Sequence, residues 1–419
     1  MARYIINGGR RLEGKARVGG AKNAILPILA AVLLTEKQVV LHDCPDLLDV
    51  AKTILILESI GCKVKREGRH LIIDPSNVSQ WVIPDCYVRE IRSSIIFLGA
   101  MLSRAGRARI TYPGGCEIGQ RPIDLHIKGL RQLGVLIDES NGYLDCVAPR
   151  MEGGVVHLDY PSVGATENVM LAAVKAKGRT VIYNAAKEPE IVDLQNFINA
   201  MGGNVRGAGT NTIVIEGVQS SFKEVEYTII PDRIVAGTYM VAAAITGGDV
   251  LVENVVPEHV QSIIYKLREA GCTVHIQDSS VRVKGKYRLR AIEHIKTLPY
   301  PGFPTDMQAQ FTSLLSVARG TSIITETIFE NRFRHVPELV RMGANIRIDG
   351  QTAIIHGVRS LKGTTVVAKD LRGGAALVLA GLRAEGQTIV ENASYIDRGY
   401  EKLEVALSAI GADIVKVDD

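Results

Sequence analysis

The sequence predicts an α/β fold made of six copies of one strand–helix unit. A pattern typical of a helix end, apolar–x–x–apolar–Gly followed by a strand-like segment, recurs six times along the 419 residues. Each glycine suits the C′ position, where a left-handed backbone closes a helix before the next strand. A near-constant spacing of about 70 residues indicates an internal repeat. The six glycines are Gly61, Gly134, Gly202, Gly271, Gly343 and Gly411.

A second pattern repeats with the same period. An apolar helix leads into a turn that often contains glycine, and then into a segment rich in β-branched residues, which favours a strand. Since 419 residues exceed the usual size of a single hydrophobic core, the six units predict two domains of three units each. The expected strands cover residues 37–41, 107–110, 179–184, 248–254, 321–324 and 387–392.

Composition excludes several classes of protein. The net charge is only +4 and no block of Lys and Arg stands out, so nucleic acid is not an expected partner. The six cysteines form no CxxC pair, which predicts a reduced, cytoplasmic protein without a metal site. The longest apolar run, residues 24–34, is too short for a membrane span and contains Pro27. The N-terminus has no signal-peptide pattern.

Polar residues precede helices that are otherwise apolar throughout, such as 24–34, 95–102, 169–174 and 375–382. Helices without a polar face belong in the interior of a domain. N-capping is the simplest explanation for part of each cluster, and we expect it for Ser93, Thr305 and Asp370. The clusters are Lys22-Asn23, Arg92-Ser93-Ser94, Ser162 with Thr166-Glu167-Asn168, Asp232-Arg233, Thr305-Asp306 with Gln308, and Asp370 with Arg372.

Capping does not explain the cations in these clusters. Lys22, Arg92, Arg233 and Arg372 would oppose the helix dipole, which costs stability unless an anion binds there. Further arginines, Arg121, Arg332 and Arg398, lie at other junctions between units, and guanidinium groups suit phosphate and carboxylate. The sequence has no GxxxxGK[ST] loop. We therefore expect an anion-binding site made by several helix N-termini.

The loop at residues 112–121 combines Cys116 with three glycines and ends in Arg121. Glycine allows such a loop to bend sharply. The local sequence leaves two interpretations of Cys116 open: a small buried hydrophobic side chain in a turn, or a thiol presented to a ligand.

Taken together, these motifs resemble the UDP-N-acetylglucosamine enolpyruvyl transferase family over essentially the whole chain. The resemblance implies two inside-out α/β barrel domains of three repeats each, residues 21–230 and residues 1–20 with 231–419, and an active site between them. The stretches that carry it are 20–24 (GAKNA), 113–116 (PGGC), 121–126 (RPIDLH), 188–193 (EPEIVD), 231–233 (PDR), 303–310 (FPTDMQAQ), 330–333 (ENRF) and 397–401 (DRGYE).

The resemblance also implies the reaction, in which the enolpyruvyl group of phosphoenolpyruvate moves to the 3′-hydroxyl of UDP-N-acetylglucosamine and phosphate leaves, as the first committed step of peptidoglycan synthesis. Cys116 would protonate the methylene carbon, since a thiol with a pKa of about 8.5 stays protonated near neutral pH. Asp306 would act as the base at the sugar hydroxyl. Lys22, Arg92, Arg121 and Arg398 would hold the phosphate side, whereas Arg332 and Arg372 would stabilise developing charge or the carboxylate.

The remaining implied contacts belong to the sugar nucleotide. Asn23 would contact the sugar. The uridine and diphosphate would lie on Arg121, Pro122, Ile123, Asp124 and Leu125, on Ser162, Val163 and Gly164, and beside Ile328. The expected catalytic set is Cys116, Asp306, Lys22 and Arg398, with no cofactor. The chain departs from the family at Leu48, where many members have Lys, and at Gly373-Gly374, which could loosen the start of that helix.

Two alternatives differ from this interpretation. The shikimate-pathway enolpyruvyl transferases share the fold and the type of reaction but lack the Pro-Gly-Gly-Cys loop. A non-catalytic paralogue that binds the sugar nucleotide would have lost Cys116, Asp306 or Lys22, and all three are present. The expected partners are therefore two small molecules, phosphoenolpyruvate and UDP-N-acetylglucosamine. The sequence leaves the oligomeric state open.

Overall fold

The computed structural model describes residues 2–114 and 123–418, and it divides into two compact units. The middle unit contains residues 20–114 and 123–230. The terminal unit contains both ends of the chain, residues 2–19 and 231–418. Each unit has its own hydrophobic core and three separate sheets.

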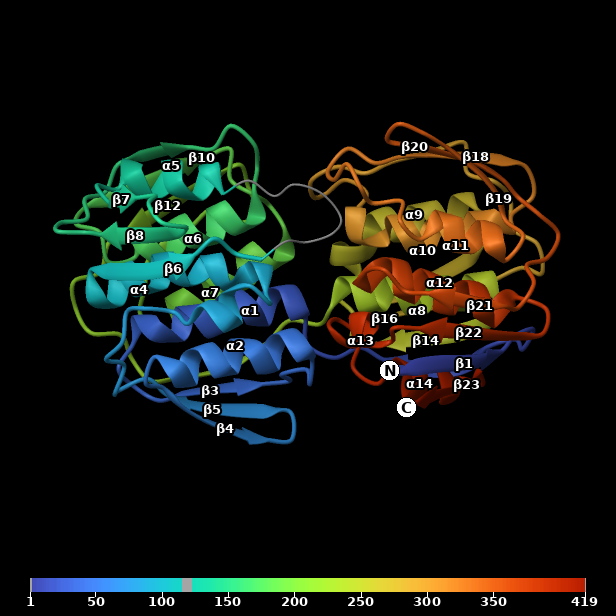
Figure 1. Cartoon of the computed structure of the whole chain (residues 1–419), viewed down its shortest axis with the longest axis horizontal. Helices are drawn as coiled ribbons and strands as arrows, with labels where there is room; N and C mark the ends of the chain where they lie inside the picture. Colours follow the sequence, from blue (N-terminus) through green and yellow to red (C-terminus); the bar gives the residue numbers. More distant parts are fainter. Residues whose placement is uncertain (1, 115–122, 419) are drawn as a thin grey trace. The chain divides into compact units, whose positions relative to one another are not determined.

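The middle unit has one three-stranded and two four-stranded sheets (Figure 1). Its strands are β3 (Val39–His42), β4 (Lys63–Glu67), β5 (His70–Asp74), β6 (Arg107–Thr111), β7 (Leu136–Asp138), β8 (Tyr143–Val147), β9 (Val155–His157), β10 (Arg179–Tyr183), β11 (Val205–Arg206), β12 (Thr212–Glu216) and β13 (Val225–Thr228). Its helices are α1 (Lys22–Ala31), η1 (Val32–Leu34), α2 (Leu48–Ser59), α3 (Asp85–Val88), η2 (Arg92–Ile96), α4 (Phe97–Ala105), α5 (Asp124–Gln132), α6 (Val163–Ala173) and α7 (Pro189–Ala200).

The terminal unit has three four-stranded sheets. Its strands are β1 (Arg3–Asn7), β2 (Glu13–Arg17), β14 (Asp249–Glu253), β15 (Thr273–Gln277), β16 (Ser280–Lys284), β17 (His294–Lys296), β18 (Thr321–Thr325), β19 (Asn345–Asp349), β20 (Thr352–His356), β21 (Thr365–Val367), β22 (Gln387–Glu391) and β23 (Asp413–Val417). Its helices are α8 (Arg233–Ile245), η3 (Pro257–Val260), α9 (Gln261–Glu269), η4 (Thr305–Met307), α10 (Gln308–Ser316), α11 (Val336–Arg341), α12 (Leu371–Arg383), α13 (Ser394–Asp397) and α14 (Leu403–Ser408).

Five of the six sheets share one strand order, and the sixth has the same order without its parallel strand, which confirms the repeat. In five of them a central strand pairs with a parallel strand on one side and an antiparallel strand on the other, as β10 does with β9 and β12. The sixth central strand, β6, has a single parallel bridge, Val82 to Arg109, where the others have a parallel strand. The central strands β3, β6, β10, β14, β18 and β22 correspond to the six segments expected from the sequence.

The ends of the chain complete the terminal unit. Strand β1 lies between β22 and β23 and is antiparallel to both (Figure 1). Strand β2 pairs in parallel with β14. The first residues of the chain therefore belong to sheets whose other strands follow residue 231, whereas β13, near the end of the middle unit, supplies the parallel partner of β3.

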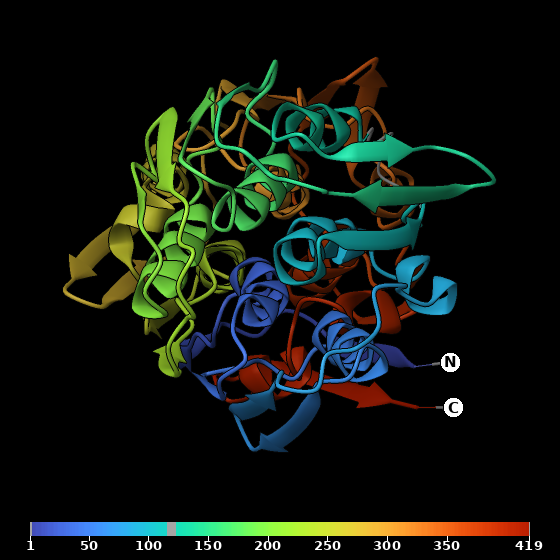
Figure 2. The same ribbon diagram turned by 90° about the vertical axis from the view of Figure 1, so that its left-hand side faces the viewer.

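The apolar helices lie inside the sheets, as predicted. Figure 2 shows helices of the middle unit end-on with strands outside them. Helices α4 and α6 pack closely because Gly99 has no side chain: a Cβ there would lie 2.1 Å from the carbonyl oxygen of Asn168. Each unit is thus an inside-out α/β assembly of three repeats, and within the described residues its sheets remain separate sheets with no closed barrel.

The helix ends agree with the sequence in one respect and differ in another. The six predicted C′ glycines all have positive φ angles, from 84° to 114°. Asp370 caps α12, and its Oδ1 accepts hydrogen bonds from the backbone N–H groups of Arg372 and Gly373. Capping by Ser93 and Thr305 is wrong. Ser93 lies inside η2, and the hydroxyl of Thr305 donates instead to Glu326.

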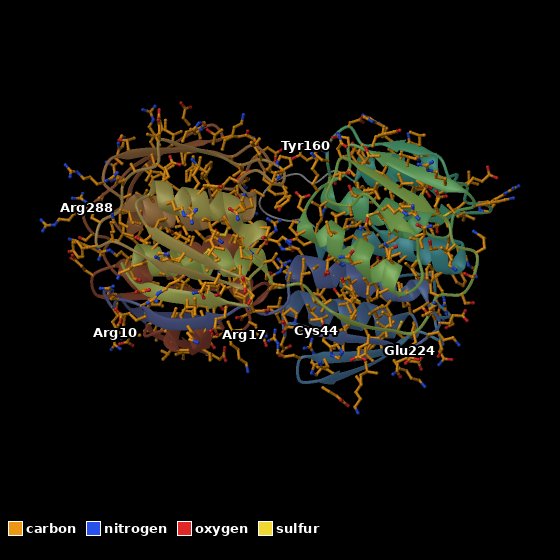
Figure 3. The ribbon with its side chains drawn as sticks, turned by 180° about the vertical axis from the view of Figure 1, so that it is seen from behind. Arg10, Arg17, Cys44, Tyr160, Glu224 and Arg288 are labelled. Atoms are coloured by element: carbon orange, nitrogen blue, oxygen red, sulfur yellow. The ribbon has the colours of Figure 1, made fainter. Side chains whose placement is uncertain are left out.

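Other expectations from composition can be compared with the structure. Within the described ranges, no helix is long and apolar enough to cross a membrane. Five cysteines are free thiols there: Cys44, Cys62, Cys86, Cys146 and Cys272. Figure 3 shows the side chain of Arg288 projecting outward from the terminal unit.

Candidate active site

Lys22 is the first residue of α1 and is almost buried. Its Nζ lies 2.6 Å from Oδ2 of Asp49, which is in the first turn of α2, and the two side chains are 11% and 6% exposed. Taking these charges out of water is costly, and each offsets that cost for the other. The sequence predicts Lys22 as a functional residue but does not identify Asp49 as its partner, because the contact joins two different helices.

Arg92 is the first residue of η2, and its side chain contacts the start of the loop at residues 112–121. Its Nη1 donates to the carbonyl oxygen of Pro113 at 3.4 Å. Cys116, Arg121 and Pro122 lie outside the described residues.

His126 on α5 is buried beside Arg92 and belongs to a network that the sequence did not reveal. Its Nδ1 lies 3.0 Å from Nδ2 of Asn168, and Oδ1 of Asn168 accepts from the backbone N–H of Gly99 at 2.6 Å. Burial and, secondarily, the charge of Arg92 lower the pKa of His126 to about 3. A neutral ring that accepts at Nδ1 carries its proton on Nε2. At Gly164 a Cβ would lie 3.1 Å from this ring, so the start of α6 approaches it closely.

The expected sugar-nucleotide contacts of the middle unit lie at two helix starts. Ser162 caps α6, and its Oγ accepts from the N–H of Ala165 at 3.3 Å. Val163 and Gly164 are the first two residues of that helix. Ile123 is the N-cap residue of α5, and Asp124 and Leu125 follow it. Free N–H groups at helix starts suit anionic groups.

In the terminal unit two arginines hold one carboxylate. Nη2 of Arg332 lies 2.6 Å from Oδ1 of Asp306, and Nη2 of Arg372 lies 3.1 Å from Oδ2. Both arginine side chains are only 4% exposed, whereas that of Asp306 is 25% exposed. Asp306 comes from η4, Arg372 from the start of α12, and Arg332 from the loop after β18. With a guanidinium on each oxygen, the carboxylate is fixed in direction and still reaches solvent.

The same arginines retain hydrogen-bonding capacity. Within the described part of the chain, Nε of Arg332 and Nη1 of Arg372 are buried without a hydrogen-bond partner. Burial acts to lower the pKa of the Arg372 guanidinium. Asp306, followed by Tyr400 and Asp232, outweighs the effect of burial, so the pKa of Arg372 is raised. Buried N–H donors without acceptors are costly. A ligand with oxygen acceptors would satisfy them.

His335 lies next to these arginines and is also buried. Neither ring nitrogen has a hydrogen-bond partner among the described residues. Its pKa is lowered to about 4, mainly by burial and further by the charge of Arg332, although Asp370 acts in the opposite direction. The ring is therefore neutral at pH 7 and adds no charge to the cluster. No local signal in the sequence marked this residue.

The terminal unit contains three further residues of the expected motifs. Arg398 is the C-cap residue of α13. Tyr400 is buried behind Arg372, with 5.3 Å between Cζ of Arg372 and the ring centre. The backbone N–H of Ile328 donates to Oε1 of Glu326 at 2.8 Å.

The departures from the family pattern have local structural effects. Leu48 is the first residue of α2 and is 42% exposed, so it provides no charge at that helix start. Gly373 and Gly374 are buried inside α12. A Cβ at Gly374 would lie 2.7 Å from Cγ1 of Ile396 on α13. The glycines therefore permit close packing of this helix start.

Comparison with known proteins gives one consistent result. The family model described as EPSP synthase (3-phosphoshikimate 1-carboxyvinyltransferase) matches residues 6–407. UDP-N-acetylglucosamine 1-carboxyvinyltransferase 2 of Caldanaerobacter subterraneus subsp. tengcongensis is 57% identical over 100% of both chains. UDP-N-acetylglucosamine 1-carboxyvinyltransferase 1 of Symbiobacterium thermophilum is 54% identical over 99% of this chain and 95% of that one.

A solved structure agrees. The enolpyruvyl transferase NikO from Streptomyces tendae superposes with a TM-score of 0.89 over 99% of each chain, at 25% identity. Full-length identity above one half, together with the match of the family model, establishes the relationship. This chain therefore belongs to the EPSP synthase family and, within it, to the UDP-N-acetylglucosamine 1-carboxyvinyltransferases.

Proposed function

We propose that this protein transfers the enolpyruvyl group of phosphoenolpyruvate to the 3′-hydroxyl of UDP-N-acetylglucosamine and releases phosphate. The observation that carries the proposal is Asp306, held on both oxygens by buried Arg332 and Arg372. An oriented, partly exposed carboxylate can accept a proton from a hydroxyl group. The adjacent N–H groups without partners suit an anionic co-substrate.

The reaction would proceed by addition and elimination. Cys116 gives its proton to the methylene carbon of phosphoenolpyruvate, and the sugar 3′-oxygen bonds to the adjacent carbon while Asp306 takes the hydroxyl proton. In the elimination a methyl proton returns to the Cys116 thiolate while the bond from the adjacent carbon to the phosphate oxygen breaks, and the double bond is restored. Lys22, Arg92, Arg121 and Arg398 would neutralise the phosphate that leaves. No metal or cofactor takes part in this scheme.

The sugar nucleotide would bind along the helix starts of the middle unit. Asn23 would contact the sugar. Arg121, Pro122, Ile123, Asp124 and Leu125, together with Ser162, Val163 and Gly164, would contact the uridine and the diphosphate. Ile328 of the terminal unit is a further proposed substrate contact. The reaction would take place in the cytoplasm, the compartment that the cysteine usage predicts.

The test is phosphate release by the purified protein, measured with phosphoenolpyruvate and one acceptor at a time. Release with UDP-N-acetylglucosamine and none with shikimate 3-phosphate supports the proposal. Release with shikimate 3-phosphate instead favours the shikimate-pathway reaction. Binding of UDP-N-acetylglucosamine without phosphate release identifies a non-catalytic paralogue.

The role of Cys116 has its own test. We expect Cys116→Ala to be inactive at neutral pH, and we expect the epoxide phosphonate fosfomycin to inactivate the wild type. Cys86→Ala is the matched control, since Cys86 is an exposed free thiol outside the proposed site. Full activity of Cys116→Ala would contradict the assignment.

A further inference from the structure

We infer that Glu326 is a positioning residue for the proposed reaction, because it fixes the turn that carries Asp306 to the loop that carries Ile328 and Arg332. The inference rests on the proposed function. Glu326 follows directly after β18 and is completely buried. No signal in the sequence pointed to it.

Both oxygens of Glu326 are used. Oε1 accepts from the hydroxyl of Thr297 at 2.8 Å and from the backbone N–H groups of Ile328 at 2.8 Å and Phe329 at 3.3 Å. Oε2 accepts from the hydroxyl of Thr305 at 2.9 Å. A buried carboxylate is costly unless it is hydrogen-bonded, and charge-assisted hydrogen bonds are the strong ones. One side chain therefore joins three segments of the terminal unit: the end of β17, η4, and the loop after β18.

The segments that Glu326 joins also hold proposed site residues. Thr305 immediately precedes Asp306, and Ile328 and Arg332 lie in the loop that Glu326 begins. The 2.6 Å contact between Arg332 and Asp306 spans these same two segments. Glu326 thus sets the distance between the base and one of the arginines that orient it.

The unusual use of Thr305 supports this role. Thr305 is the first residue of η4 and follows its N-cap residue, Pro304, whose side chain has no group that could cap the helix. The hydroxyl of Thr305 makes no local cap and donates to Glu326, 21 residues away along the chain. It therefore secures the position of this turn relative to the loop.

A second contact reinforces the same junction. The hydroxyl of Thr297, which donates to Glu326, accepts from the backbone N–H of Thr327 at 2.9 Å. The loop after β18 is therefore fixed to the segment that follows β17. The backbone N–H of Thr327 donates to Thr297, and the N–H groups of Ile328 and Phe329 donate to Glu326, which in turn accepts from Thr297. Removing the Thr305 hydroxyl should leave this part intact and release only the turn that carries Asp306.

The experiment compares Thr305→Val, Thr305→Ser and Thr246→Val in the intact protein. Thr246 is the matched control: a partly buried threonine of the same unit, whose hydroxyl donates at 2.8 Å to the carbonyl of Ala242 at the far end of α8. A small displacement of a catalytic group can cost about 10² in rate. We expect kcat for phosphate release to fall at least about tenfold in Thr305→Val.

Serine retains the hydroxyl, so Thr305→Ser should keep kcat within about threefold of the wild type. Thr246→Val should keep the wild-type kcat. The KM for phosphoenolpyruvate should stay unchanged in Thr305→Val. Its melting temperature should fall more than that of Thr246→Val, because Oε2 of the buried Glu326 loses the hydroxyl that donates to it. Glu326→Gln, which keeps the shape of the side chain, should lower kcat in the same direction.

Three results would overturn the inference in an active wild type: a normal kcat in Thr305→Val, failure of serine to restore kcat, or a normal kcat in folded Glu326→Gln. A wild type that releases no phosphate would overturn the proposed function itself. The two failures are therefore distinguishable.

Discussion

Each unit places a carboxylate next to cations at or near helix starts, but the two units use different chemistry. In the middle unit one lysine meets one aspartate, Lys22 with Asp49, and both are nearly buried. In the terminal unit two arginines meet one aspartate, and Asp306 stays 25% exposed. An ammonium is a compact charge on a flexible stem, whereas a guanidinium is a planar fork that fixes a carboxylate in direction. The same scaffold thus provides a charge in one unit and an oriented base in the other.

The largest expected effect comes from removing the oriented base. Asp306→Asn should lower kcat for phosphate release about 10³-fold, because general bases contribute about 10²–10⁴. Binding of UDP-N-acetylglucosamine, measured by calorimetry, should persist. Asp278→Asn, at an exposed aspartate of the same unit, is the control and should retain full activity. A kcat within tenfold of the wild type would remove Asp306 from the mechanism.

The next effect concerns the buried lysine pair. Lys22→Gln leaves Asp49 buried without its cation, which should destabilise the middle unit by about 3 kcal/mol. The double variant Lys22→Gln/Asp49→Asn should recover part of the loss in melting temperature. Lys128→Gln is the matched control, because its ion pair with Asp159 has the same 2.6 Å distance but is exposed. Equal losses for Lys22→Gln and Lys128→Gln would show that burial of the pair does not matter.

Replacing the planar guanidinium of Arg332 by the ammonium group of a lysine should have a smaller effect. Arg332→Lys keeps the charge but loses the planar geometry, and we expect kcat/KM to fall about 30-fold, equivalent to about 2 kcal/mol. Arg288→Lys, at an exposed arginine, should change nothing. If Arg332→Lys retains full kcat/KM, charge alone is sufficient and the contrast between the two units is lost.

The last expected effect is absent at neutral pH and appears only in acid: a pH dependence of the stability of the middle unit. The pKa of His126 is lowered from 6.5 to about 3, so the unfolded chain binds this proton more tightly than the folded one. Stability is full above pH 6.5 and falls toward pH 3, by up to about 1.4 kcal/mol per pH unit. His126→Asn should flatten this slope in a series of melting temperatures.

Asp193 acts in the opposite direction in the same unit. Burial raises its pKa from 3.8 to about 6, so its contribution falls as the pH rises through that interval. For this reason the measurement is the difference between the wild type and His126→Asn, in which Asp193 cancels. An unchanged slope in the variant would contradict the buried, neutral state of His126.

The sequence predicted the parts of the site that depend on local patterns. Lys22, Arg92 and Arg372 were predicted because a cation at the start of an apolar helix opposes the helix dipole, and all three lie at helix starts. Asp306 was predicted from the family resemblance. Asp49, the partner of Lys22, was missed because the contact joins two different helices. His126 and Asn168 are 42 residues apart, and no periodicity connects such a pair.

Thr305 illustrates why local reasoning can fail even where it finds the right residue. A threonine at an expected helix start predicts a cap, and a cap requires only the next few residues. In the structure Thr305 is the first residue of η4, and Pro304 is the N-cap residue. The hydroxyl instead donates to Glu326, 21 residues away. The choice between these two acceptors depends on how β18 and its following loop pack against the turn.

By itself the sequence determined the repeat. Six glycines at a constant spacing end six helices, because a left-handed backbone at each position depends only on the residue type and its neighbours. The apolar helices had to be interior because they have no polar face. Only the tertiary structure decided which strands complete which sheet. Strand β1 pairs with β22 and β23 across almost the whole chain. Its alternating pattern would suit any of the six sheets, and the choice depends on long-range packing.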